Sequence, residues 1–220
     1  MKVSVYVLFG LFFLVGCGES NKENQADKKK SSGPISGITS LPRNGGGSKN
    51  IPSFSNEEGV LKMGDNQSPD KFDDPTDLVL PSEVGGEAVT TIASGAFSDS
   101  SNLTSVVIPD TVTSIGDGAF YNNANLKSVT IPNSVKSIGS GAFYACVSLT
   151  EITIPASVTS ISEMAFLDCK NLKKVTFLGK PPALKKASTI FENTSVTIYY
   201  DPKISGWGAS FAGRACEPME

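Results

Sequence analysis

The sequence predicts a mostly β solenoid of the α/β repeat type, in which 23-residue units stack so that their strands run in parallel. Two observations predict this fold. Four phenylalanines recur every 23 residues, each after an alanine and each six residues before a leucine; they are Phe97, Phe120, Phe143 and Phe166. Three consecutive segments, which begin at Ile108, Ile131 and Ile154, also share the pattern I-P-x-x-V-x-x-I. A fixed period of this length is typical of units that have no core of their own and bury their apolar faces on their neighbours.

The predicted solenoid covers residues 77–198 in about five units. An earlier, longer copy begins at Leu80 and carries five extra residues around Gly85-Gly86. A degraded copy begins at Phe177, where the period slips by two residues, so that Phe191 corresponds to Phe166. On this alignment Thr197 corresponds to Thr176.

Each unit is predicted to contain one main strand, as in residues 126–131. Side chains alternate along a strand, so Val129 and Ile131 face the core while Ser128 and Thr130 face outward. A proline, which has no N–H for a ladder, ends the strand. A second, short extended stretch follows at 135–138. We expect Gly139 to allow a turn with positive φ, and residues 142–143 to form a short helical or 3₁₀ turn on the opposite side.

Residues 1–17 are predicted to be a lipoprotein signal peptide. Lys2 supplies the positive charge, and residues 3–15 form an apolar stretch shorter than the ~20 residues that span a bilayer. Leu14-Val15-Gly16-Cys17 resembles a bacterial lipobox, which implies cleavage before Cys17 and lipidation of its sulfur. An ordinary secretory signal with an incidental cysteine is the alternative. We therefore expect a lipid-anchored protein of the bacterial cell envelope, and Gly18, which is not aspartate, favours the outer membrane or cell surface.

Residues 18–76 are predicted to be a flexible tether. They are rich in Ser, Asn, Gly, Lys and Asp and lack periodicity. Such a composition cannot bury enough apolar surface to offset the entropy of ordering. Four apolar residues within it mark either a weak strand or the edge of an N-terminal cap; they are Ile51, Phe54, Val60 and Leu61.

The repeat pattern L-x-x-V-x-I-P-x-x-V-x-x-I-G-x-x-A-F-x-x-C resembles the BspA-type leucine-rich repeat of bacterial cell-surface proteins, over about residues 78–215. The resemblance implies a leucine-rich-repeat solenoid with a protein-binding or adhesion role and no catalytic residues. The family cysteine corresponds to Cys146 and Cys169, with Ser100 and Ala124 in its place in two other units. That position is usually buried in the family, which favours reduced thiols over a Cys146–Cys169 disulfide but leaves both open.

Residues 199–220 resemble the C-terminal end of such arrays. Tyr199, Tyr200, Trp207 and Phe211 would then close the last apolar layer. Cys216 would lie beyond this cap, exposed, and either unpaired or linked to another chain.

The composition excludes several classes of function. The chain has no histidine, which removes Ser-His-Asp and Cys-His sites and most zinc sites. Its net charge of −3 argues against nucleic-acid binding. Four carboxylates fall at different repeat positions and are not expected to converge in a cleft; they are Asp117, Glu151, Glu163 and Asp168. We expect no catalytic residue, metal or cofactor, and no enzyme.

The concave strand face is the usual binding surface of a solenoid. Its outward positions form two columns, from which we select as candidate binding residues Ser105, Ser128, Thr130, Glu151, Thr153, Lys174, Thr176 and Thr197. The alternative is that threonine merely suits an exposed strand. The predicted function is a membrane-anchored, extracytoplasmic binding module for an extracellular or envelope protein or glycan; a structural scaffold of the envelope is the alternative.

Overall fold

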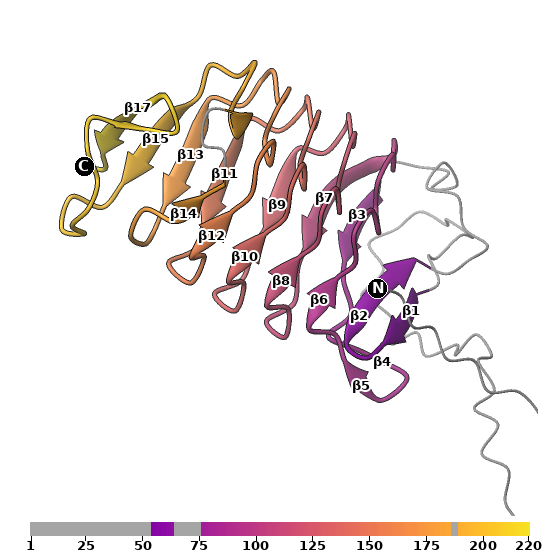
Figure 1. Ribbon diagram of the computed structural model, residues 1–220. Coiled ribbons are helices and arrows are strands. Elements are labelled where there is room, and N and C mark those ends of the chain that lie inside the picture. Colours follow the sequence, from indigo (N-terminus) through magenta and orange to yellow (C-terminus); the bar gives the residue numbers. More distant parts are fainter. Residues whose placement is uncertain (1–53, 64–75, 186–188) are drawn as a thin grey trace, which may run out of the picture. The chain divides into compact units, whose positions relative to one another are not determined.

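The computed structural model of the protein describes residues 54–63, 76–185 and 189–220. Within these ranges the chain is a β-solenoid without an α-helix, and each unit contributes one long and one short strand (Figure 1). The long strands are β3 (Thr76–Val79), β7 (Leu103–Val107), β9 (Ser128–Thr130), β11 (Glu151–Ile154), β13 (Lys174–Phe177) and β15 (Thr197–Tyr200). The short strands are β6 (Thr91–Ile92), β8 (Ser114–Ile115), β10 (Ser137–Ile138), β12 (Ser160–Ile161) and β14 (Ala183–Leu184).

Strands of successive units pair in parallel with a register of 23 residues. Ser137 pairs with Ser160 in the short-strand sheet, and Glu151 pairs with Lys174 among the long strands. The five extra residues of the first unit form a hairpin of β4 (Glu83–Val84) and β5 (Glu87–Ala88), whose two loop glycines have the positive φ that such a tight turn requires. The predicted mostly β, parallel solenoid is therefore confirmed.

The four repeating phenylalanines form a buried aromatic stack with a fifth, Phe191. Successive ring centroids lie 5.3–5.5 Å apart and the rings are tilted by at most 11°. Each ring is at most 1% exposed, so the stack is core. It confirms that Phe191 corresponds to Phe166 despite the two-residue slip.

The turn that carries each phenylalanine is not helical, which differs from the sequence prediction. Its N–H groups alternate between two acceptors: Tyr144 donates within the turn to Gly141 O at 3.0 Å, whereas Phe143 donates to Ala165 O of the next unit at 2.9 Å. This alternation needs left-handed residues, and both Gly141 and Ala145 have positive φ. The strand-like pairing between units thus replaces the helical turn.

Gly139 does not have the positive φ that the sequence predicts. A Cβ at this position would lie 2.6 Å from the backbone N of Asp117, closer than real contacts allow. The glycine is therefore needed because two backbones approach closely, and Gly141 supplies the left-handed turn.

A second buried column consists of side chains with a hydrogen-bond donor, three residues after each phenylalanine of the stack. Cys146 Sγ donates to Phe120 O at 3.3 Å, and Cys169 Sγ donates to Phe143 O at 3.0 Å. Both cysteines are free thiols, and burial raises the pKa of Cys169 to about 12. In the preceding unit Asn123, not Ala124 as predicted, occupies this position, and its Nδ2 donates to Phe97 O at 2.8 Å.

The N-terminal side of the short-strand sheet is covered by a hairpin of β1 (Phe54–Glu57) and β2 (Val60–Met63), with β2 parallel to β6. Leu61 is fully buried in the solenoid core. The folded domain therefore includes residues 54–63 of the predicted tether, where Phe54, Val60 and Leu61 had indicated a weak strand or the edge of an N-terminal cap. The rest of that predicted tether up to residue 53, with residues 64–75, and the predicted signal peptide with Cys17 lie outside the described residues.

The C-terminal end is closed by aromatic residues and by a further strand. Trp207 packs 5.1 Å from Phe177 and 5.0 Å from Phe211, and its Nε1 donates to Gly179 O. Strand β17 (Arg214–Pro218) extends the parallel ladder beside β15 and pairs with β16 (Ser210–Phe211). Cys216 is part of β17, where it is half-buried against the core, so it does not lie beyond the cap as predicted.

Candidate functional site

The outward side chains of the long strands form two columns, which we call the long-strand face. The strands belong to two hydrogen-bonded sets, β3-β7-β9 and β11-β13-β15, and the first column runs Asp77, Ser105 and Ser128 on the first set and Glu151, Lys174 and Thr197 on the second. The second column runs Val79, Val107, Thr130, Thr153, Thr176 and Tyr199, and then Glu217. All eight predicted binding residues lie on this face; Ser128, Thr130, Glu151, Thr153 and Lys174 are exposed and the other three are half-buried.

The structure corrects the position of Thr197. It pairs with Lys174 rather than with Thr176, because the two-residue slip that begins before Phe191 is reversed before β15. Tyr199 therefore takes the place predicted for Thr197 and leaves the C-terminal aromatic cap to which the sequence analysis assigned it. Counting 23 residues on from Thr176 would have identified it.

Tyr199 gives the C-terminal end of this face an aromatic and charged cluster. Lys174 Nζ lies 5.2 Å from the centroid of the Tyr199 ring, within the range of a cation–π contact. On the other side Tyr199 pairs with Glu217, whose negative charge raises the pKa of the tyrosine. Glu151, next to Lys174 in the first column, adds a second exposed carboxylate.

The N-terminal end of the long-strand face is different in character. Val79 and Val107 pair across β3 and β7 and are 43% and 39% exposed, which makes them an apolar patch. Asp77 beside them accepts hydrogen bonds from Ser105 Oγ at 2.6 Å and Thr104 Oγ1 at 2.9 Å, and these bonds lower its pKa. The face thus offers an apolar end, a hydroxyl-rich middle and a charged aromatic end.

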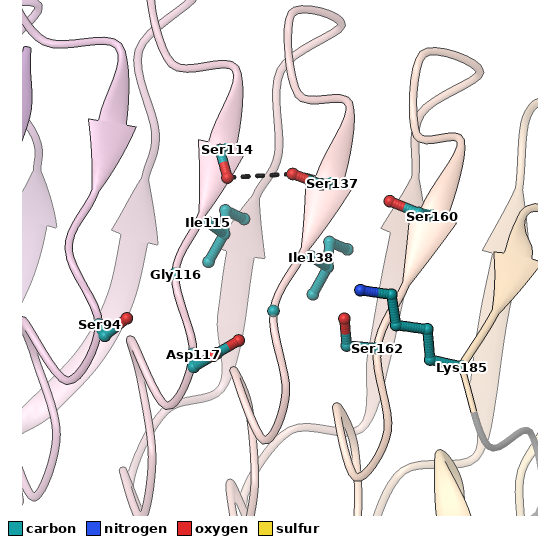
Figure 2. A pocket seen from close by; sticks show the side chains of 11 residues that line it. Ser94, Ser114, Ile115, Gly116, Asp117, Ser137, Ile138, Ser160, Ser162 and Lys185 are labelled. Carbon is teal, nitrogen blue, oxygen red and sulfur yellow. Dashed lines mark hydrogen bonds between the residues drawn. The ribbon is translucent and has the colours of Figure 1, made fainter. Parts of the chain in front are cut away.

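A groove lies along the short strands β8, β10 and β12. Figure 2 shows this groove, of about 290 Å³, with Asp117 toward one end and Lys185 at the other. Its wall is a row of serines, of which Ser114 and Ser137 share a hydrogen bond of 3.0 Å. Its floor includes Gly116 and Gly139, whose packing leaves no room for a Cβ, so the small residues here have a structural reason.

The four carboxylates considered for hydrolysis do not meet. Glu151 is on the long-strand face and Asp117 lines the groove, whereas Asp168 lies on a turn, where it accepts hydrogen bonds from Asn193 and Tyr144. The described residues hold no group of three or more side chains that could ligate a metal. The same residues form no helix that is long and apolar enough to cross a membrane.

Three comparisons relate the chain to known proteins. The family model described as "BspA type Leucine rich repeat region" matches six copies over residues 90–205. A leucine-rich-repeat protein of T. pallidum has a TM-score of 0.58 at 24% identity, covering 67% of this chain and 68% of that one. A leucine-rich cell-surface protein from Faecalibacterium prausnitzii has a TM-score of 0.55 at 25% identity; the match covers 72% of this chain but only 39% of that one. Among curated proteins, none matches the chain.

Proposed function

The chain belongs to the BspA-type leucine-rich-repeat family, and we propose that it is a non-catalytic, extracytoplasmic module that binds protein through its long-strand face. The observation that carries this proposal is the face itself: the central strands β9, β11 and β13 present exposed polar side chains, and Lys174 and Tyr199 form an anchor at one end. Tyrosine is enriched among the residues that dominate binding energy. The likeness to a bacterial protein described as a cell-surface protein supports the location.

The size of the face suggests that one copy binds weakly. Six strands spaced at about 4.8 Å, each with about four residues, give a surface of roughly 24 by 13 Å, on the order of 300 Å². Stable interfaces bury about 800 Å² on each partner. We therefore propose that the protein acts by avidity, with many anchored copies engaging a repetitive or multivalent partner.

Anchoring is the second part of the proposal. We propose that Cys17 is lipidated and that the segment between it and the solenoid is a tether. Replacing Cys17 with serine should move the protein from the detergent-rich to the aqueous phase in a phase-partition assay. Partition of the variant into detergent, as for the unaltered protein, would contradict a lipid on this cysteine.

Site-specific photocrosslinking in living cells tests the binding surface. A photoreactive phenylalanine analogue is placed at Thr153, in the exposed middle of the long-strand face, and in a control at Lys136, which is exposed on the segment before β10. The proposal expects discrete adducts from position 153 that disappear when Lys174→Glu and Tyr199→Ser are added. Adducts only from position 136, or adducts at 153 that persist in that double variant, would contradict it.

A further inference from the structure

An exposed apolar patch lies on the turns, away from the long-strand face. Its members are Tyr121, Tyr144 and Leu167, which succeed one another at the same position of three units, together with Met164. Tyr121 and Met164 are 40% and 36% exposed, whereas Tyr144 and Leu167 are half-buried. We call these four residues the turn patch.

The two tyrosines form a stacked pair whose outer member is uncovered. Their ring centroids lie 4.7 Å apart and the rings are tilted by 9°. The hydroxyl of Tyr144 donates to Asp168 Oδ2 at 3.0 Å. The equivalent neighbour of Tyr121 is Ala145, whose side chain has no acceptor. On the other side, the position equivalent to Tyr121 in the preceding unit is Ser98, whose side chain is too short to cover a ring.

The backbone of Met164 is a second, independent observation about the turn patch. It has a φ of 58°, in the left-handed region, where the three preceding units have Gly95, Gly118 and Gly141. A left-handed residue with a side chain is strained, and its exposed side chain gains little packing in return. Strain of this kind, when stability does not explain it, is a pointer to function.

The charges on the same turns indicate the partner. Within residues 94–101, 117–124, 140–147, 163–170 and 189–194 there are five carboxylates and one ammonium, that of Lys170, and the guanidinium of Arg214 reaches the last of these turns, where it donates to Phe191 O. The carboxylates belong to Asp99, Asp117, Glu163, Asp168 and Glu192. An apolar and aromatic patch among like negative charges is complementary to a basic side chain, and a guanidinium can stack on a tyrosine ring while it donates to carboxylates.

We propose that the turn patch binds an arginine-bearing segment of a protein partner, with a guanidinium on the uncovered face of Tyr121. This interaction surface is separate from the long-strand face and does not depend on it. The turn patch should prefer arginine to lysine, because only the planar guanidinium can stack on the tyrosine ring and at the same time donate hydrogen bonds to two carboxylate oxygens.

Fluorescence anisotropy with labelled hexa-arginine, hexa-lysine and hexa-glutamate peptides tests the proposal on the full chain carrying Cys17→Ser. Hexa-arginine should bind several-fold tighter than hexa-lysine, and hexa-glutamate should not bind. Tyr121→Ser, which copies the residue of the preceding unit, should weaken hexa-arginine binding about three-fold, the loss of one exposed cation–π contact. Met164→Gly should weaken it too while melting no lower than the unaltered protein, which separates a contact from a folding defect.

Leu178→Ser, at a residue that is 43% exposed and belongs to neither surface, is the control and should leave hexa-arginine binding unchanged. Equal binding of the arginine and lysine peptides, or unchanged binding in both Tyr121→Ser and Met164→Gly, would reduce the effect to diffuse charge attraction and overturn the proposal. Binding of a neutral hexasaccharide that is lost in Tyr121→Ser, without binding of the peptide, would assign the patch to glycans and overturn it as well.

Discussion

Asn123 and Phe97 are joined by a buried hydrogen bond of 2.8 Å from Nδ2 to the main-chain oxygen, the same bond that two cysteine thiols make one and two units later. Three successive units therefore use this side chain to satisfy the main-chain oxygen of the preceding unit's phenylalanine, whereas the equivalent Ser100 has no hydrogen-bond partner for its Oγ. Asparagine fulfils the role imperfectly, because its Oδ1 is buried without a partner.

Replacing Asn123 with cysteine should therefore stabilise the protein. The thiol keeps a donor for Phe97 O and removes the orphaned acceptor, whose burial costs about 1–3 kcal/mol. Urea denaturation of the two proteins measures the difference. Asn123→Ala is the control and should destabilise, since it removes the donor and leaves a void; a cysteine variant no more stable than the alanine variant would contradict this account of the column.

Phe143→Ala should destabilise the solenoid by about 3–5 kcal/mol. The ring is fully buried and stacks on Phe120 and Phe166 on its two faces, so its loss interrupts the aromatic stack in the middle. A circular-dichroism melt measures the effect. Tyr144→Ala, one residue on but only half-buried, should cost clearly less, and equal losses would mean that the stack is not the source of stability.

Gly139→Ala should destabilise by about 1–3 kcal/mol, the usual cost of overpacking. Its new Cβ would meet backbone atoms of Gly116 and Asp117 at 2.6 Å, and backbone cannot move aside as a side chain can. Ser162 occupies the equivalent position in the next unit, so Ser162→Gly is a control that should have a small effect. Thermal melts of both variants measure the effect. If Gly139→Ala is as stable as Ser162→Gly, the two backbones do not approach closely at this position.

Met164→Gly should raise the free energy of unfolding by about 1 kcal/mol. It relieves a left-handed φ that costs roughly 1–2 kcal/mol, offset in part by the greater freedom of glycine in the unfolded chain. Gly141→Ala, the reverse change at the equivalent position, should destabilise. If urea titrations show no gain in the free energy of unfolding for Met164→Gly, the left-handed backbone of Met164 is not strained.

Stability should fall in acid partly through Asp168. Hydrogen bonds from Asn193 and from Tyr144 lower the pKa of this carboxyl. Because the folded pKa lies below the unfolded value of about 3.9, the contribution is present above that pH and is lost as the pH falls through the folded pKa. Comparing Asp168→Asn with the unaltered protein between about pH 6 and 2 should show a stability difference that narrows in acid; a difference independent of pH would contradict this.

The repeat period predicted most of the fold, because it reports directly on what each unit buries. The aromatic stack, the alternation of Val129 and Thr130, and the place of the five extra residues around Gly85-Gly86 all follow from positions in the 23-residue pattern. What the pattern could not show was the backbone between strands. Bonds to the next unit, rather than bonds along the chain, determine the turn at 142–143, and the need for glycine at 139 comes from another unit's backbone.

The candidate site was predictable where the period is intact and was misplaced where it slips. Seven of the predicted residues stand in their expected columns, whereas Thr197 shifts by one column and Tyr199 replaces it. The buried position of Asn123 was likewise missed by one residue. Phe54, Val60 and Leu61 pointed to a weak strand or a cap edge, but the pairing of the hairpin at 54–63 with β6 did not follow from them, because this segment lies outside the 23-residue pattern.

Protease treatment of intact cells, followed by immunoblotting for the solenoid, tests most directly whether the protein works outside the cell. A periplasmic protein serves as the control for an intact outer membrane. Loss of the solenoid signal while the control survives is the predicted result. Protection until the outer membrane is permeabilised would contradict surface presentation and would favour a scaffold within the envelope.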